Sequence, residues 1–98
     1  MDQSALDNFM TNDEVMTSFP NPITDKATIL FLVGEDTHAV LEVYSYNGAK
    51  VASLLDRAVV AGESVSVDFN SASIAAGLYF CKLTMGGQVY THKIMINK

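Results

Sequence analysis

Cysteine, basic residues and long apolar runs are all scarce in this chain of 98 residues. The single cysteine, Cys81, excludes an intrachain disulfide and a cysteine-rich zinc site. Six basic residues against 11 acids give a net charge of −5, which argues against a nucleic-acid partner because such partners need cations to replace phosphate counterions. No apolar run approaches the ~20 residues that span a bilayer. Residues 1–4 also lack a signal-peptide pattern, so an export leader, if the protein is exported, is expected upstream, on a larger protein.

The acidic excess is concentrated at the N-terminus. Residues 1–14 contain four acids and no base, whereas the rest of the chain carries seven acids against six bases. Leu6, Phe9 and Met10 are spaced for a single helical turn, which Asn12-Asp13 would end. We therefore expect residues 1–16 to be an acidic linker remnant and residues 17–98 to be the folded domain.

The rest of the chain has the period-two alternation of β-strands. Seven alternating or β-branched runs are expected to be strands: residues 15–19, 27–33, 39–45, 50–55, 64–69, 78–84 and 88–96. Turn residues separate them at spacings of about 8–12 residues, which indicates an all-β, immunoglobulin-like antiparallel β-sandwich of about seven strands.

Inward-facing side chains and turns follow from the same alternation. The core is expected to contain Ile29, Phe31, Leu41, Val43, Val51, Val65, Val67, Phe69, Cys81 and Leu83. Asn47-Gly48 predicts a type I′ hairpin turn, with positive φ at both residues.

Patterns for metal binding are weak. His38 and His92 are far apart in sequence, with no second histidine or cysteine near either. Glu35-Asp36 supplies too few oxygens for calcium, which takes 6–8 ligands, so a solvated turn is the favoured interpretation.

Catalytic and phosphate-binding patterns are no stronger. Cys81 lies inside an expected strand, which favours a buried structural thiol over a nucleophile. Gly86-Gly87 lies between two strands and does not open a helix, so it indicates a hairpin and not a phosphate cradle. The residues point to no cofactor, no metal and no enzymatic activity.

Four motifs occur in a recognisable order: FPNP at 19–22, LEVYSYNGAKV at 41–51, IAAGLYF at 74–80 and KIMINK at 93–98. Together they resemble the C-terminal sorting domain of the type IX (Por) secretion system of Bacteroidetes, over about residues 17–98. Ala49 and Ile74 depart from the family pattern, which usually has a basic residue and a leucine there. The motif positions that would be structural are Pro20, Asn21, Pro22, Gly48, Gly77 and Tyr79.

This resemblance implies a secretion signal and not a catalyst. It implies an upstream cargo domain joined through residues 1–16, which crosses the periplasm in transit and passes an outer-membrane translocon with its shuttle components. A cell-surface sortase normally removes the domain, and we expect cleavage within about residues 1–18. The cargo would end at the outer-membrane cell surface or outside the cell.

The last strand is the expected recognition element, with Lys93, Ile94, Met95, Ile96 and Lys98 as candidates. No downstream residue shields its edge, and an unpaired strand is what an export receptor captures by β-augmentation. The alternative is that edge lysines only prevent aggregation. Pro20 and Pro22 would protect a neighbouring edge, and the motif glycines would relieve strained turns.

Two other functions remain open from the residues alone. An ancillary carbohydrate- or protein-binding module would use an exposed coplanar aromatic pair from Tyr44, Tyr46, Tyr79, Phe80 and Tyr90, although packing explains these residues better. An assembly subunit would self-associate through the terminal strand or the N-terminal tail.

Overall fold

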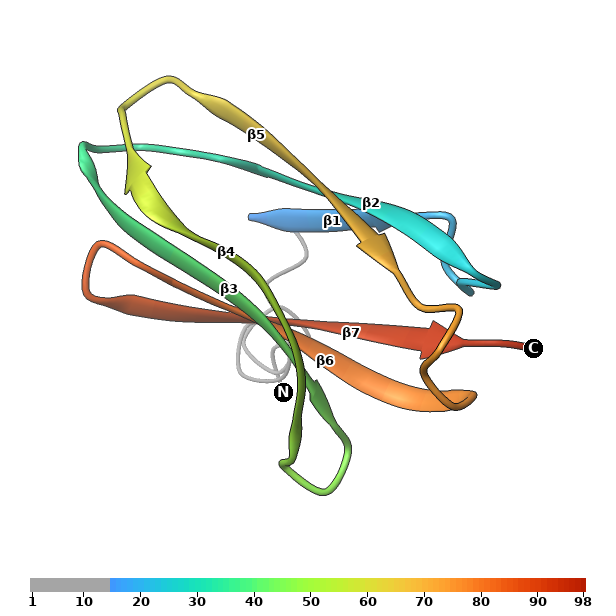
Figure 1. Cartoon of the computed structure of the whole chain (residues 1–98). Helices are drawn as coiled ribbons and strands as arrows, with labels where there is room; N and C mark the ends of the chain where they lie inside the picture. Colours follow the sequence, from blue (N-terminus) through green and yellow to red (C-terminus); the bar gives the residue numbers. More distant parts are fainter. Residues whose placement is uncertain (1–14) are drawn as a thin grey trace, which may run out of the picture.

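The computed structural model describes residues 15–98, which form two packed antiparallel sheets without a helix (Figure 1). The strands are β1 (Met16–Phe19), β2 (Lys26–Leu32), β3 (Thr37–Ser45), β4 (Lys50–Val59), β5 (Ser64–Asn70), β6 (Gly77–Met85) and β7 (Gln88–Ile96). One sheet has the order β1-β2-β5 and the other has the order β4-β3-β6-β7. The predicted β-sandwich is confirmed. None of the described residues forms a helix long and apolar enough to cross a membrane.

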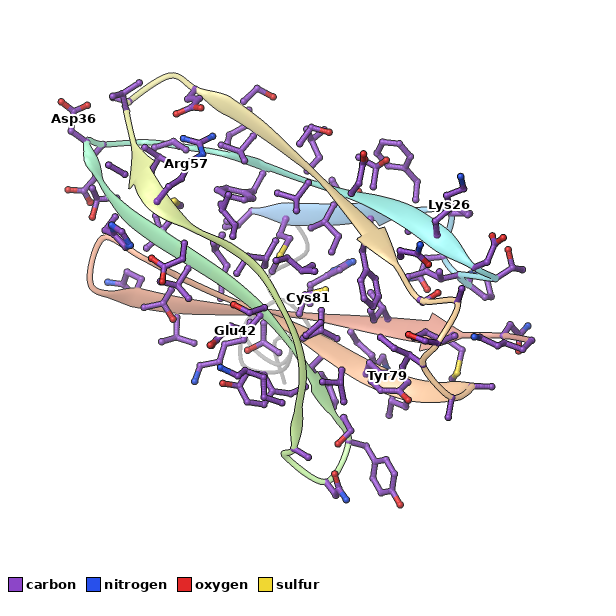
Figure 2. The ribbon with its side chains drawn as sticks, viewed as in Figure 1. Lys26, Asp36, Glu42, Arg57, Tyr79 and Cys81 are labelled. Carbon is purple, nitrogen blue, oxygen red and sulfur yellow. The ribbon has the colours of Figure 1, made fainter. Side chains whose placement is uncertain are left out.

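Alternate side chains from both sheets meet in a single core. Strand β5 alternates strictly between exposed and buried residues, as its SVSVDFN sequence predicts. Phe31 and Phe69 from the smaller sheet, and Leu41 and Leu83 from the larger, are at most 1% exposed. Cys81 lies between the two sheets and is fully buried, which confirms its predicted place (Figure 2).

The prediction that Val51 belongs to the core is wrong. Its side chain is 39% exposed. Between the pairs Val43–Ala52 and Tyr44–Lys50 the register shifts by one residue, which leaves Val51 without an opposite residue. Odd-numbered residues on the two sides of this shift therefore lie on opposite faces of β4.

Several strand boundaries also differ from those expected, most of all the end of β4. Strand β4 continues to Val59, because residues 56–59 pair with the start of β3. These residues do not alternate in hydrophobicity because β4 is an edge strand. Strand β1 begins at Met16, which is fully buried, one residue after the expected start of this strand at residue 15. The other expectations for residues 1–14 lie outside the described residues.

The β3–β4 hairpin has a different turn from the predicted type I′. Gly48 has a φ of 91°, whereas no non-glycine residue between 15 and 98 has a positive φ. Gly48 N–H donates to Ser45 O at 3.0 Å, and Ser45 N–H donates to Ala49 O at 2.8 Å. This is the pattern of a three-residue loop, in which an ordinary turn is followed by one left-handed glycine.

Replacing Gly48 with valine should lower the free energy of unfolding by about 1 kcal/mol or more, because a left-handed φ is strained for a β-branched residue. Gly34→Val is the matched control, since Gly34 has no positive φ and nothing lies within 4 Å of the added Cβ. Thermal melting compares the two variants. An unchanged midpoint for Gly48→Val would contradict the left-handed turn.

Candidate functional site

Three segments that are distant in sequence meet at one end of the sandwich. Figure 1 shows the β1–β2 connection, the β5–β6 connection and the C-terminus at this end. These segments contain the FPNP, IAAGLYF and KIMINK motifs, so three of the four motifs form one structural unit. The fourth contains the β3–β4 hairpin and lies elsewhere.

Residues 21–23 form hydrogen bonds along the outer edge of β7. Asn21 Nδ2 donates to Lys93 O at 3.4 Å, and Asn21 Oδ1 accepts from Met95 N–H at 3.2 Å. The backbone of Ile23 continues the ladder: its N–H donates to Met95 O at 2.8 Å, and its carbonyl accepts from Asn97 N–H at 2.7 Å. The Asn21 carboxamide thus takes the place of a peptide group in a short parallel pairing with β7.

This arrangement corrects the expectation of an open final strand. Strand β7 is an edge strand, but an upstream segment already occupies its backbone over residues 93–97. β-Augmentation needs unpaired backbone groups. In the folded domain a receptor would therefore have to displace residues 21–23 before it could pair with this part of β7.

The five candidate residues of the last strand have three different environments. Ile94 and Ile96 are each 1% exposed and belong to the core. Lys93 is exposed and Met95 is 42% exposed, so both present side chains to solvent. Lys98 is tied down: its Nζ donates to Ser71 O at 2.8 Å and to Ala72 O at 2.7 Å.

The lysine contacts show that Lys93 and Lys98 differ in their importance for the fold. Lys93→Ala should leave stability within about 0.5 kcal/mol, as for most surface changes. Lys98→Ala would remove the donor that joins the chain end to two carbonyls of the β5–β6 loop. We therefore treat only Lys93 as a replaceable surface charge.

Tyr79 and Gly77 support the β5–β6 loop. Tyr79 is 7% exposed, and its hydroxyl donates to Ala75 O at 2.7 Å. Gly77 has a φ of 148° and pairs with Ile96. Figure 2 shows Tyr79 beside this loop. Tyr79 thus bonds to the same loop that binds Lys98 through other carbonyls.

The prolines restrict the segment that carries Asn21. Each proline ring fixes φ, so Pro20 and Pro22 limit the backbone on both sides of the asparagine. Restricting this short segment favours the side-chain geometry that matches two groups of β7. Sequence reasoning identified the PNP motif as a structural turn but missed its partner, because the hydrogen bonds join residues more than 70 positions apart.

The described residues contain no group of three or more His, Cys, Asp or Glu side chains placed to hold a metal ion. His38 pairs with Asp56. His92 is buried and meets Ser18 Oγ through Nε2 at 2.9 Å, which joins β7 to β1. Asp36 Oδ1 accepts from Ala61 N–H at 2.9 Å, so this carboxylate braces a turn.

Of the five aromatic side chains considered for a sugar platform, Tyr46 is strongly exposed, Tyr79 is buried, and the other three (Tyr44, Phe80 and Tyr90) are half-buried. Phe19 is 52% exposed on β1 of the smaller sheet, and Tyr46 is 75% exposed in the β3–β4 hairpin of the larger sheet. They belong to different sheets and cannot act as a coplanar pair.

Replacing Asn21 with alanine should weaken the end of β7 by about 1 kcal/mol for the lost hydrogen bonds. Hydrogen exchange at the Met95 amide should accelerate, because this amide donates to Asn21 Oδ1. Asn97→Ala is the matched control, since no hydrogen bond from its side chain to a described residue is seen. Equal exchange at Met95 in both variants would refute the role of the Asn21 side chain.

Comparison with known proteins identifies a family whose model covers most of the chain, and a solved structure with a similar fold. The model of the family described as "Secretion system C-terminal sorting domain" matches residues 17–97. The fold is similar to part of the dimeric latent PorU from Porphyromonas gingivalis, with a TM-score of 0.66 and 23% identity over 83% of this chain. The chain spans only 9% of that protein's length. A search of curated proteins finds no match.

Proposed function

The chain belongs to the family of type IX secretion system C-terminal sorting domains, and from that premise we propose which of its surfaces the secretion machinery recognises. A domain of this family is the signal that directs the protein carrying it to the cell surface or the extracellular space. The observation that carries the function is the family match over residues 17–97, nearly the whole described domain.

The exposed side of the final strand is the recognition surface that we favour. Ile94 and Ile96 are buried, and Lys98 Nζ is bound to backbone carbonyls. Among the candidate residues, Lys93 and Met95 offer exposed side chains that a partner can contact without displacing the hydrogen bonds of Lys98 or opening the core. The Lys93 ammonium and the Met95 thioether lie on the same face of β7, because the two residues are two positions apart in the strand.

The route and the other partners follow from family membership. The cargo would precede residue 17 and be joined through residues 1–16, cross the periplasm, and meet the translocon with its shuttle components. A cell-surface sortase would then cleave before the folded domain. A cut in this segment would release the sandwich intact.

The test fuses a reporter to the N-terminus of the chain in a type IX-competent host. The intact chain should carry the reporter to the surface, and Lys93→Ala combined with Met95→Ser should reduce delivery several-fold. Lys26→Ala combined with Leu32→Ser is the matched control, because both of its residues are exposed on the smaller sheet. Both pairs should leave stability within about 0.5 kcal/mol per change, since surface substitutions usually do so.

The outcomes test the β7 recognition surface and the sorting function of the chain independently. Equal delivery by both double variants would refute the β7 surface while leaving the sorting function intact. Failure of the intact chain to deliver the reporter, in a host that delivers its own type IX cargo, would refute the sorting function for this chain.

A further inference from the structure

Three of the four sheet edges in this sandwich are closed. Strand β4 is interrupted by two register shifts, and the Arg57 guanidinium donates to the neighbouring carbonyl of Ala58 at 2.9 Å. Strand β7 is occupied over residues 93–97 by the Asn21 side chain and Ile23. Strand β1 has only four residues and is followed by Pro20. Bulges, short strands, charges and prolines are the usual means of blocking edge pairing.

Strand β5 is the exception. Its seven residues contain no proline, lysine or arginine, and its register with β2 is unbroken. Figure 1 shows β5 at the outer limit of its sheet, with no strand beyond it. Asp68 is its one charged residue, and with no bulge, proline or short length to block pairing, this edge is open to a further strand.

The backbone groups on the open side can be assigned from the pairing with β2. Glu63 O accepts from Val33 N–H at 2.9 Å, and Ser71 N–H donates to Asp25 O at 2.8 Å. Hydrogen-bonded pairs alternate along an antiparallel ladder. The odd-numbered residues of β5 therefore bond to β2, and the even-numbered residues direct N–H and C=O groups outward: Ser64, Ser66, Asp68 and Asn70. No backbone hydrogen bond from another described segment reaches these outward groups.

We propose that β5 pairs antiparallel and in full register with β5 of a second copy of this chain. Val67 is the middle residue of the strand, so the two-fold axis would pass beside it. Ser66 then lies opposite Asp68 of the second copy, and Ser64 lies opposite Asn70. Each outward residue exchanges two backbone hydrogen bonds with its opposite.

The side chains suit this register. A serine hydroxyl donates to a carboxylate at each Ser66–Asp68 pair, and no two like charges are opposite one another. On the inner face Val65 meets Phe69 of the second copy, so the apolar layer continues from one smaller sheet into the other. A shift by one pair in one direction would place Asp68 opposite Asp68, and like charges directly opposite are destabilising.

Opposite charge changes at one position test the contact. Ser66→Lys would place an ammonium opposite Asp68 of the second copy, and Ser66→Asp would place a second carboxylate there. Sedimentation equilibrium of the full chain over a concentration series should show weak dimers for the wild type, about fivefold tighter dimers for Ser66→Lys and about fivefold weaker dimers for Ser66→Asp. Thr17→Lys and Thr17→Asp are controls with the same net charges, because Thr17 lies in the same cross-strand row but two strands away.

Cysteine cross-linking tests the register. Opposite residues in a hydrogen-bonded pair have Cα atoms about 5.5 Å apart, which a disulfide can span, whereas Ser66 and its own copy would be about 9 Å apart. An oxidised mixture of Ser66→Cys and Asp68→Cys chains should give a covalent heterodimer, and either variant alone should give none. Cys81 is buried and does not compete.

These measurements can overturn the proposal. A wild-type chain that stays monomeric at every concentration, together with no cross-linking in the mixture, would show that β5 does not self-pair. Equal responses at Ser66 and Thr17 would show that net charge, and not the β5 edge, controls association. A covalent dimer from Ser66→Cys alone would exclude the full register.

Discussion

Deleting residues 94–98 should keep a fused reporter off the cell surface and should also lower the free energy of unfolding by several kcal/mol. Ile94 and Ile96 are each 1% exposed, and burying such a side chain contributes roughly 1.5–3 kcal/mol. The deletion also removes the partners of Ile23 and the Lys98 contacts with the β5–β6 loop. Surface immunoblotting and urea unfolding of the purified chain measure the two effects. Normal surface delivery by the deleted form would exclude a role for this strand in sorting.

A single substitution distinguishes the effect of lost stability from the effect of a lost recognition surface. Ile96→Ala should cost about 2–5 kcal/mol through the cavity that it leaves, but it retains the exposed Lys93 and Met95. At a temperature where this variant stays folded, delivery should match the wild type. Loss of delivery by a folded Ile96→Ala chain would indicate that the machinery reads the buried side of β7, and therefore that it unfolds the strand.

Stability should fall steeply in alkali because of Cys81. Burial raises the pKa of this thiol from 9.0 to about 12. Between these values the folded chain holds the proton and the unfolded chain releases it. The free energy of unfolding therefore falls as the pH rises. The expected loss of stability is about 1.4 kcal/mol per pH unit above pH 9, and the contribution is fully present below that pH.

The Cys81→Val variant isolates this effect from the titration of lysines and tyrosines. Urea unfolding at pH 8, 9, 10 and 11 should give two parallel curves up to about pH 9, the unfolded thiol's ordinary pKa. Above it the wild type should decline faster. Labelling of Cys81 by a thiol reagent at neutral pH should require unfolding. Rapid labelling of the native chain, or equal pH slopes, would contradict a buried, protonated thiol.

Local patterns predicted the strands that alternate cleanly. The period of two in β5, and the side chains of Leu83 and Cys81 in β6, settled which face of each strand is buried. The period fails at Val51, because a register shift changes the face without changing the composition. A single sequence contains no signal for such a shift in an exposed edge strand.

The Asn47-Gly48 pair shows a second limit of local reasoning. The dipeptide correctly located a tight turn, but both two-residue and three-residue hairpin loops accept it. The register of β3 and β4 on either side selects the longer loop. Pairing along the whole hairpin outweighs the preference of the two turn residues.

The candidate site was predictable in its parts and not in its assembly. The motifs at 19–22 and 93–98 were identified separately, and nothing in a local pattern relates Asn21 to Met95. Their pairing depends on the sandwich topology, which places the β1–β2 connection beside the end of β7. Long-range contacts of this kind follow only from the fold.

The parallel pairing of residues 21–23 with the end of β7 also determines how the domain responds to tension. Strands β1 and β7 run in the same direction, toward the end of the sandwich where Ile23 meets Ile96. Opposite pulls on residue 15 and Lys98 therefore act along these strands, at right angles to their ladder hydrogen bonds. Such a load strains the bonds of each ladder together instead of opening them one after another. A domain pulled at these two ends would therefore resist unfolding more strongly than one whose hydrogen bonds break in sequence.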